Sequence, residues 1–147
     1  MKVSKAIKVK NFTAFLLFFL LVISCTYLLV YKASFLPSGF DLVSKQKDSV
    51  SIMSYNLFGV EEGVSTISFS KKEEWKINEI GNEVKRQKEF LWLLFSMFSI
   101  SIYLIIYKLR KGMKFWRAIL ESNIVFTVLI PLYIIINSLN RIQFLIH

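Results

Sequence analysis

Residue types that commonly carry catalysis are scarce in this chain. The single histidine is the terminal His147 and the single cysteine is Cys25, so a Ser–His or Cys–His pair is not expected and no intrachain disulfide can form. The sequence contains no G-x-S-x-G, H-E-x-x-H or phosphate-loop motif. The paired carboxylates at 61–62 and 73–74 lie in polar stretches typical of solvated faces. We therefore predict no catalytic residues, no cofactor and no metal site.

Cys25 is a candidate for lipid attachment. The preceding residues Val22, Ile23 and Ser24 follow a basic start and an apolar stretch, which matches the letters of the bacterial lipobox. Apolar sequence continues past Cys25 to Tyr31, however, whereas signal-peptide apolar regions have only about 7–15 residues. The continuation favours an intact membrane span over cleavage, and lipidation is the alternative.

Glu121 is the one charged residue within a third apolar run. An ionisable group inside a membrane is a functional candidate, because burying its charge costs a few kcal/mol. Arg117 lies four residues earlier, so the two side chains can form a helical ion pair at the membrane surface. We expect this pairing rather than a proton or ion pathway.

The composition indicates a membrane protein. Hydrophobic residues make up 54% of the 147 residues and the mean hydropathy is +0.51. Three apolar runs, residues 12–31, 90–107 and 118–136, each have the length of about 20 residues that a helix needs to cross a bilayer. The predicted fold is a membrane α-helical protein with three transmembrane helices. A small α+β insertion, made of a hairpin and a helix, lies between spans one and two.

Basic residues predict the orientation. Residues 1–11 hold four lysines and residues 108–117 hold five Lys or Arg, whereas the basic residues of the 32–89 link are spread among acids. Dense basic clusters beside spans favour the cytoplasm. We therefore expect a plasma (inner) membrane protein with a cytoplasmic amino end, and with residues 32–89 and the short tail 137–147 outside. The net charge of +9 then reflects topology and lipid contact, and no nucleic-acid partner is predicted.

The 32–89 segment has the pattern of a small ordered domain. Two strand-like stretches around a Gly-flanked loop predict a hairpin over residues 50–69. Ser70 and Glu73 fit a capping box, which predicts a helix over residues 71–89 that continues into span two. Ile77, Ile80 and Val84 fall on one face of this helix. With Trp75, these residues are candidates for packing on the hairpin or on a partner.

A domain of this size buries little core and has no disulfide or metal to stabilise it. We expect it to rest on the helix, the bilayer surface or another membrane or extracytoplasmic protein. Polar residues within the spans are candidates for hydrogen bonds between helices. These residues are Ser96, Ser99, Ser101, Asn123 and Thr127.

The sequence favours a non-enzymatic membrane protein that acts by protein–protein binding. Immunity proteins that guard bacterial membranes against pore-forming toxins are similar to it in size and span count, which is a similarity of architecture only. An accessory subunit of a transporter, secretion or envelope complex is the alternative. A small channel or proton carrier using Glu121 is a further alternative, and a homo-oligomer is left open.

Overall fold

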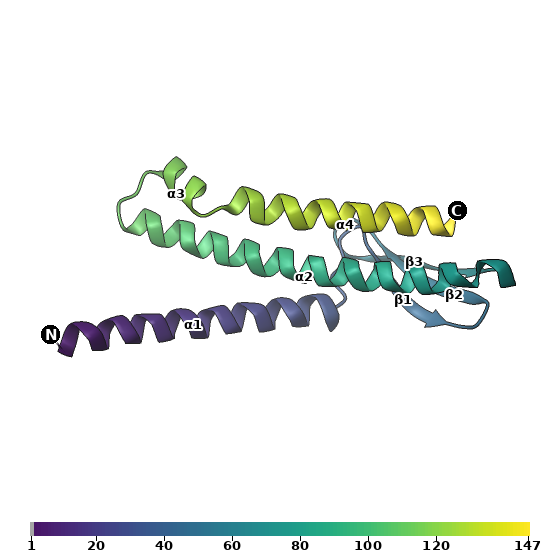
Figure 1. Ribbon diagram of the computed structural model, residues 1–147, viewed down its shortest axis with the longest axis horizontal. Coiled ribbons are helices and arrows are strands. Elements are labelled where there is room, and N and C mark those ends of the chain that lie inside the picture. The colour runs from purple at the N-terminus through teal and green to yellow at the C-terminus, as the bar shows by residue number, and fades with distance from the viewer. Residues whose placement is uncertain (1) are drawn as a thin grey trace.

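The computed structural model describes residues 2–147 and is mostly helical, with three long apolar helices and one small antiparallel sheet (Figure 1). The prediction of a mostly helical fold with a small strand-containing insertion is confirmed, with three strands in place of the two expected. In chain order, the elements are α1 (Lys2–Tyr31), β1 (Phe40–Lys45), β2 (Ser49–Tyr55), β3 (Glu61–Ser68), the 3-10 turn η1 (Lys71–Glu73), α2 (Glu74–Arg110), α3 (Phe115–Glu121) and α4 (Ile124–Ile146).

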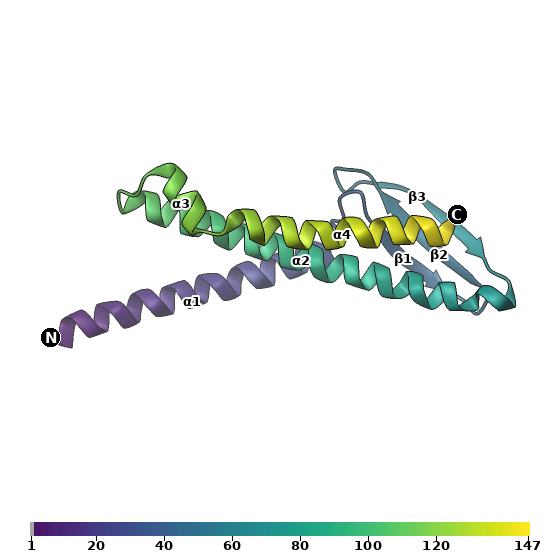
Figure 2. The ribbon, with the colours of Figure 1, turned by 45° about the horizontal axis from the view of Figure 1, so that its top comes forward.

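Each of the three long helices is long and apolar enough to cross a membrane. Helix α1 begins at Lys2, so the helix extends through the basic start as well as the apolar run. The C-terminal end of α1 lies against α2, and α1 diverges from α2 toward its own N-terminus (Figure 2). Its buried positions Val22, Thr26 and Val30 are spaced by four residues, so only one narrow stripe of α1 contacts the rest of the chain.

Helix α2 has 37 residues and is the longest helix of the fold. It continues from the insertion into the second apolar run, as predicted. Its start differs from the predicted capping box. The Ser70 hydroxyl donates to the Glu73 carboxylate at 3.2 Å and makes no side-chain cap to a backbone N–H. The chain instead enters α2 through η1, a tighter turn that is common at helix ends.

The third apolar run is divided between two helices rather than forming one helix over residues 118–136. Helix α3 ends at Glu121, and Asn123 adopts a left-handed conformation with φ 54° before α4 begins. Asn tolerates this conformation better than most residues, which explains why the break falls here. Helix α4 then continues to Ile146, so most of the predicted tail, residues 137–147, is helical.

The sheet has three strands in the order β1-β2-β3, all antiparallel. Strands β2 and β3 form the predicted hairpin, with Val50 opposite Ile67. Strand β1 was not predicted. It pairs Phe40 with Ser54 and contains an irregularity between Leu42 and Ser44.

The core of the sheet domain is made by three separate parts of the chain. Val50 and Ile52 of β2 pack against one face of α2 and against the last turns of α4. The α2 residues are Ile77, Ile80 and Val84, and the α4 residues are Ile142 and Leu145. The chain's own C-terminal helix therefore supplies a surface on which the small domain closes. A second cluster, which includes Val30, Tyr55, Leu91 and Ile135, joins the domain to the three long helices.

Candidate protein-binding surface

The four residues predicted to pack on the hairpin or on a partner divide into two groups. Ile77, Ile80 and Val84 are at most 4% exposed and lie in the core between the sheet and α4. Trp75, two residues before Ile77, is 57% exposed. Of the four side chains, only Trp75 is accessible to a partner in this structure.

Strand β3, which precedes this tryptophan in the sequence, lies at a free edge of the sheet. It is the last strand of the sheet and pairs only with β2 among the elements that the structure describes. Every β3 residue is exposed except Ile67, which is half-buried. The strand has eight residues and contains neither Pro nor Lys, two residue types that commonly protect edge strands from pairing. Its outer edge therefore offers unpaired backbone N–H and C=O groups to an extended segment.

The opposite edge, β1, is tied to α2 by polar side chains. Lys88 Nζ lies 2.6 Å from Asp41 Oδ1, and both side chains are less than one-fifth exposed. Lys45 Nζ donates to Asn78 Oδ1 at 2.6 Å. The Phe40 N–H donates to Oε1 of the buried Gln87 at 3.1 Å. These contacts hold the sheet against α2 on the β1 side and leave β3 as the open side.

A second set of polar contacts fastens α4 to α2 within the domain. Ser138 Oγ donates to the buried carboxylate of Glu83 at 2.7 Å. Arg141 reaches Glu79 at 2.6 Å and Glu83 at 3.6 Å. The sequence analysis did not identify these residues. The spacing of four between Glu79, Glu83 and Gln87 on one face of α2 is the signal that could have found them.

The polar residues predicted to join the helices fall into three groups. Ser96 lies 2.6 Å from the hydroxyl of Thr26 on α1, a partner that the sequence analysis did not name. Ser101 lies 3.4 Å from Thr127 and so links α2 to α4. Ser99 instead donates to its own helix at Phe95, and Asn123 forms the turn between α3 and α4.

Glu121 forms the predicted pair with Arg117 at 2.9 Å, and Lys108 Nζ joins it at 3.3 Å. Hydrogen bonds from Arg117 and Lys108 hold the pKa of the Glu121 carboxyl below its ordinary value. The side chain is 39% exposed and lies at the end of α3, before α4 begins. This geometry gives Glu121 the role of a surface ion pair that ties α3 to α2.

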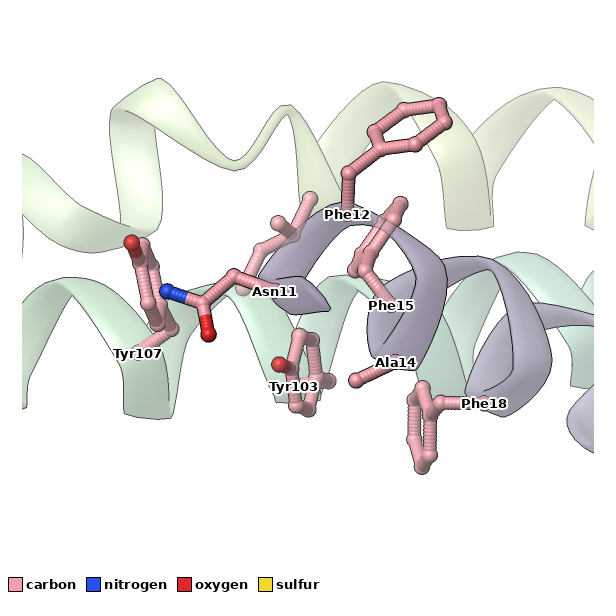
Figure 3. Close-up of a pocket in the computed structure, with 8 residues that line it drawn as sticks. Asn11, Phe12, Ala14, Phe15, Phe18, Tyr103 and Tyr107 are labelled. Carbon is pink, nitrogen blue, oxygen red and sulfur yellow. The ribbon is translucent and has the colours of Figure 1, made fainter. Parts of the chain in front are cut away.

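A groove of about 720 Å³ lies between the diverging parts of α1 and α2 (Figure 3). Aromatic rings make up most of its lining, with Phe12, Phe15 and Phe18 from α1 and Tyr103 and Tyr107 from α2. The Tyr103 ring lies 4.6 Å from the Phe18 ring. The groove holds no His, Cys, Asp or Glu, and among residues 2–147 no cluster of three such residues could hold a metal ion. Cys25 lies on α1 outside this groove, is exposed, and is part of an unbroken helix.

Comparisons with protein-family models, with curated proteins and with solved structures find no match to this chain.

Proposed function

We propose that this chain is a non-enzymatic integral membrane protein that binds another protein through the free edge of β3. The observation that carries the proposal is the contrast between the two edges of the sheet. Strand β1 is tied to α2 through Lys88 and Gln87, whereas β3 is exposed along almost its whole length. An extended partner segment can add to such an edge as a further strand.

The side chains of β3 and the start of α2 suggest what the partner segment carries. Glu61 and Glu62 open the strand and favour basic residues on the partner. Val64 and Trp75 are more than half exposed and offer apolar contacts. Backbone hydrogen bonds along the strand would supply affinity, and these side chains would supply specificity.

The proposed placement is a plasma membrane with the amino end and residues 108–117 in the cytoplasm. Three candidate spans and two basic clusters support it. The packing of α4 on the sheet supports the count of three spans, because the C-terminal end of α4 lies beside the insertion. A chain with three spans requires that arrangement.

Cysteine labelling tests the placement. In a Cys25→Ser background, cysteines replacing Ser65 and Gly112 should react from opposite sides of the membrane, with Ser65 reacting from outside intact cells. Labelling of the Gly112 position from outside would reverse the proposed orientation.

We propose protection against a membrane-active toxin as the specific function, with the β3 edge capturing a segment of the toxin. An accessory role in a transporter, secretion or envelope complex uses the same surface, and the identity of the bound protein separates the two. Purification in mild detergent followed by mass spectrometry identifies that protein.

The β3 edge is tested with a matched pair of substitutions. Val64→Lys places a charge on β3, and Val43→Lys places the same charge on β1, where the original valine has a similar exposure of 55% against 51%. We expect Val64→Lys to reduce co-purification of the partner and Val43→Lys to leave it unchanged, because an edge lysine opposes strand addition. Equal effects of the two variants would contradict binding at β3.

The ion-pathway alternative makes the opposite prediction. Glu121 is paired with two cations and is partly exposed, so neutralising it should leave partner binding intact. If Glu121→Gln abolishes function while Trp75→Ala and Val64→Lys do not, the pathway reading replaces the binding reading.

A further inference from the structure

The loop between β2 and β3, residues 56–60, carries the most exposed apolar side chains of the sheet domain. Leu57 is 70% exposed, Phe58 is 78% exposed and Val60 is 58% exposed. Three apolar side chains together on one loop form a patch that water solvates poorly. The proposed binding at the β3 edge does not use this loop.

The backbone of the loop satisfies most of its own hydrogen bonds. Asn56 Oδ1 accepts from the N–H groups of Phe58 at 2.9 Å and Val60 at 3.0 Å. The Gly59 N–H donates to the Asn56 carbonyl, and the Asn56 N–H donates to the Val60 carbonyl. Gly59 has φ +75°, a conformation that glycine adopts without strain. A loop built in this way can enter an apolar phase without stranding these N–H groups.

The loop lies level with the start of the second apolar run. Gly59 packs against the ring of Phe35, close enough that a Cβ at Gly59 would lie 2.8 Å from that ring. The Phe35 ring in turn lies 5.9 Å from the ring of Phe95 on α2. Phe95 is five residues beyond Phe90, where the uncharged run begins, which is a rise of about 8 Å along a helix.

The fold explains this position. Strand β2 runs toward the membrane-proximal end of the domain, so Tyr55 at its end shares a cluster with Val30 and Leu91. The loop follows directly, at the end of the sheet where α1 also ends (Figures 1 and 2). Nearby on α1 and α2, Tyr27 and Tyr31 make edge contacts with Trp92, and such aromatic residues are typical of the membrane interface.

We propose that Leu57, Phe58 and Val60 insert into the interfacial region of the outer leaflet and anchor the sheet domain to the bilayer. The inference rests on the proposed placement of α1, α2 and α4 in a membrane. Insertion is driven by apolar burial rather than by charge, because residues 55–60 carry no charge and two glutamates follow. Those glutamates restrict the loop to a shallow depth. Anionic lipid is therefore not required.

Spin-label accessibility tests the proposal on the full chain in phosphatidylcholine nanodiscs that hold one copy. In the Cys25→Ser background, nitroxide labels are attached to cysteines replacing Phe58, Val64 and Phe98. Collisions with apolar oxygen and with a water-soluble nickel complex are then compared. The ratio of oxygen to nickel collisions should be several-fold higher at Phe58 than at Val64 and highest at Phe98, and phosphatidylglycerol should not change it.

The three positions separate the possible failures. A Phe58 label with the same ratio as the Val64 label, while Phe98 is in lipid, overturns loop insertion but leaves the membrane placement intact. A Phe98 label in water overturns the placement itself. A Phe58 label shielded from both reagents indicates a protein contact and overturns the lipid proposal. Because Phe58 is exposed, its replacement should not unfold the domain, and a Leu57→Cys label should give the same profile.

Discussion

Ile142 is the side chain through which the C-terminal helix closes the sheet domain. It is completely buried and lies in one cluster with Val50, Ile52 and Ile80. Replacing a buried isoleucine with alanine costs about 2–5 kcal/mol, through lost burial and the cavity that remains. At about 3 kcal/mol, the population of domains opened at this core rises about 150-fold, since each 1.4 kcal/mol is a factor of ten.

Amide hydrogen exchange measures this opening directly. In nanodiscs, the β2 peptide spanning Ser49–Tyr55 should exchange much faster in Ile142→Ala than in the parent chain, because its amides are protected by the closed core. Phe144→Ala is the matched control, since Phe144 lies on the same helix and is 79% exposed. If the two variants change β2 exchange equally, α4 does not stabilise the sheet and the reasoning is refuted.

Three further predictions concern individual residues. A double-mutant cycle of Thr26→Ala and Ser96→Ala should show a coupling of about 0.6–1.7 kcal/mol in unfolding measurements, and purely additive losses would contradict the α1–α2 hydrogen bond. The lowered pKa of Glu121 means that its ion pairs add stability above the ordinary carboxyl pKa and lose it as the pH falls through the lowered value. Arg117→Ala should raise that pKa in an NMR titration, and an unchanged value would show that the pair is absent. Mass spectrometry should find the intact chain without lipid on Cys25, whereas a lipidated species beginning at Cys25 would establish the lipobox reading.

Features that depend on neighbouring residues could be predicted from the sequence. The three apolar runs, the continuous α2 and the β2–β3 hairpin follow from hydropathy and periodicity over a few residues. The Arg117–Glu121 pair follows from a spacing of four on a helix. The free edge of β3, by contrast, could not be predicted from the sequence. The sequence shows a strand but not which strand lies at the end of the sheet.

Strand β1 was missed for a related reason. Residues 40–45 contain Asp41 and Lys45 and have little apolar alternation, so they do not resemble a strand. Their extended conformation is held by β2 and by Lys88 and Gln87 of α2, which lie more than 40 residues away. Only the folded chain brings these groups together.

The sequence by itself determined that the chain is mostly helical, where its three apolar runs lie and that the segment between the first two runs forms a small domain. Tertiary structure decided how that domain is completed. The short apolar stripe at Ile142 and Leu145 has the same sequence pattern whether it ends a membrane span or packs on a sheet. The membrane contact proposed for the exposed loop at Leu57 and Phe58 likewise depends on the position of the loop level with Phe95. Local patterns encode secondary structure because they depend on nearby residues, whereas the choice of which surfaces meet depends on the whole chain.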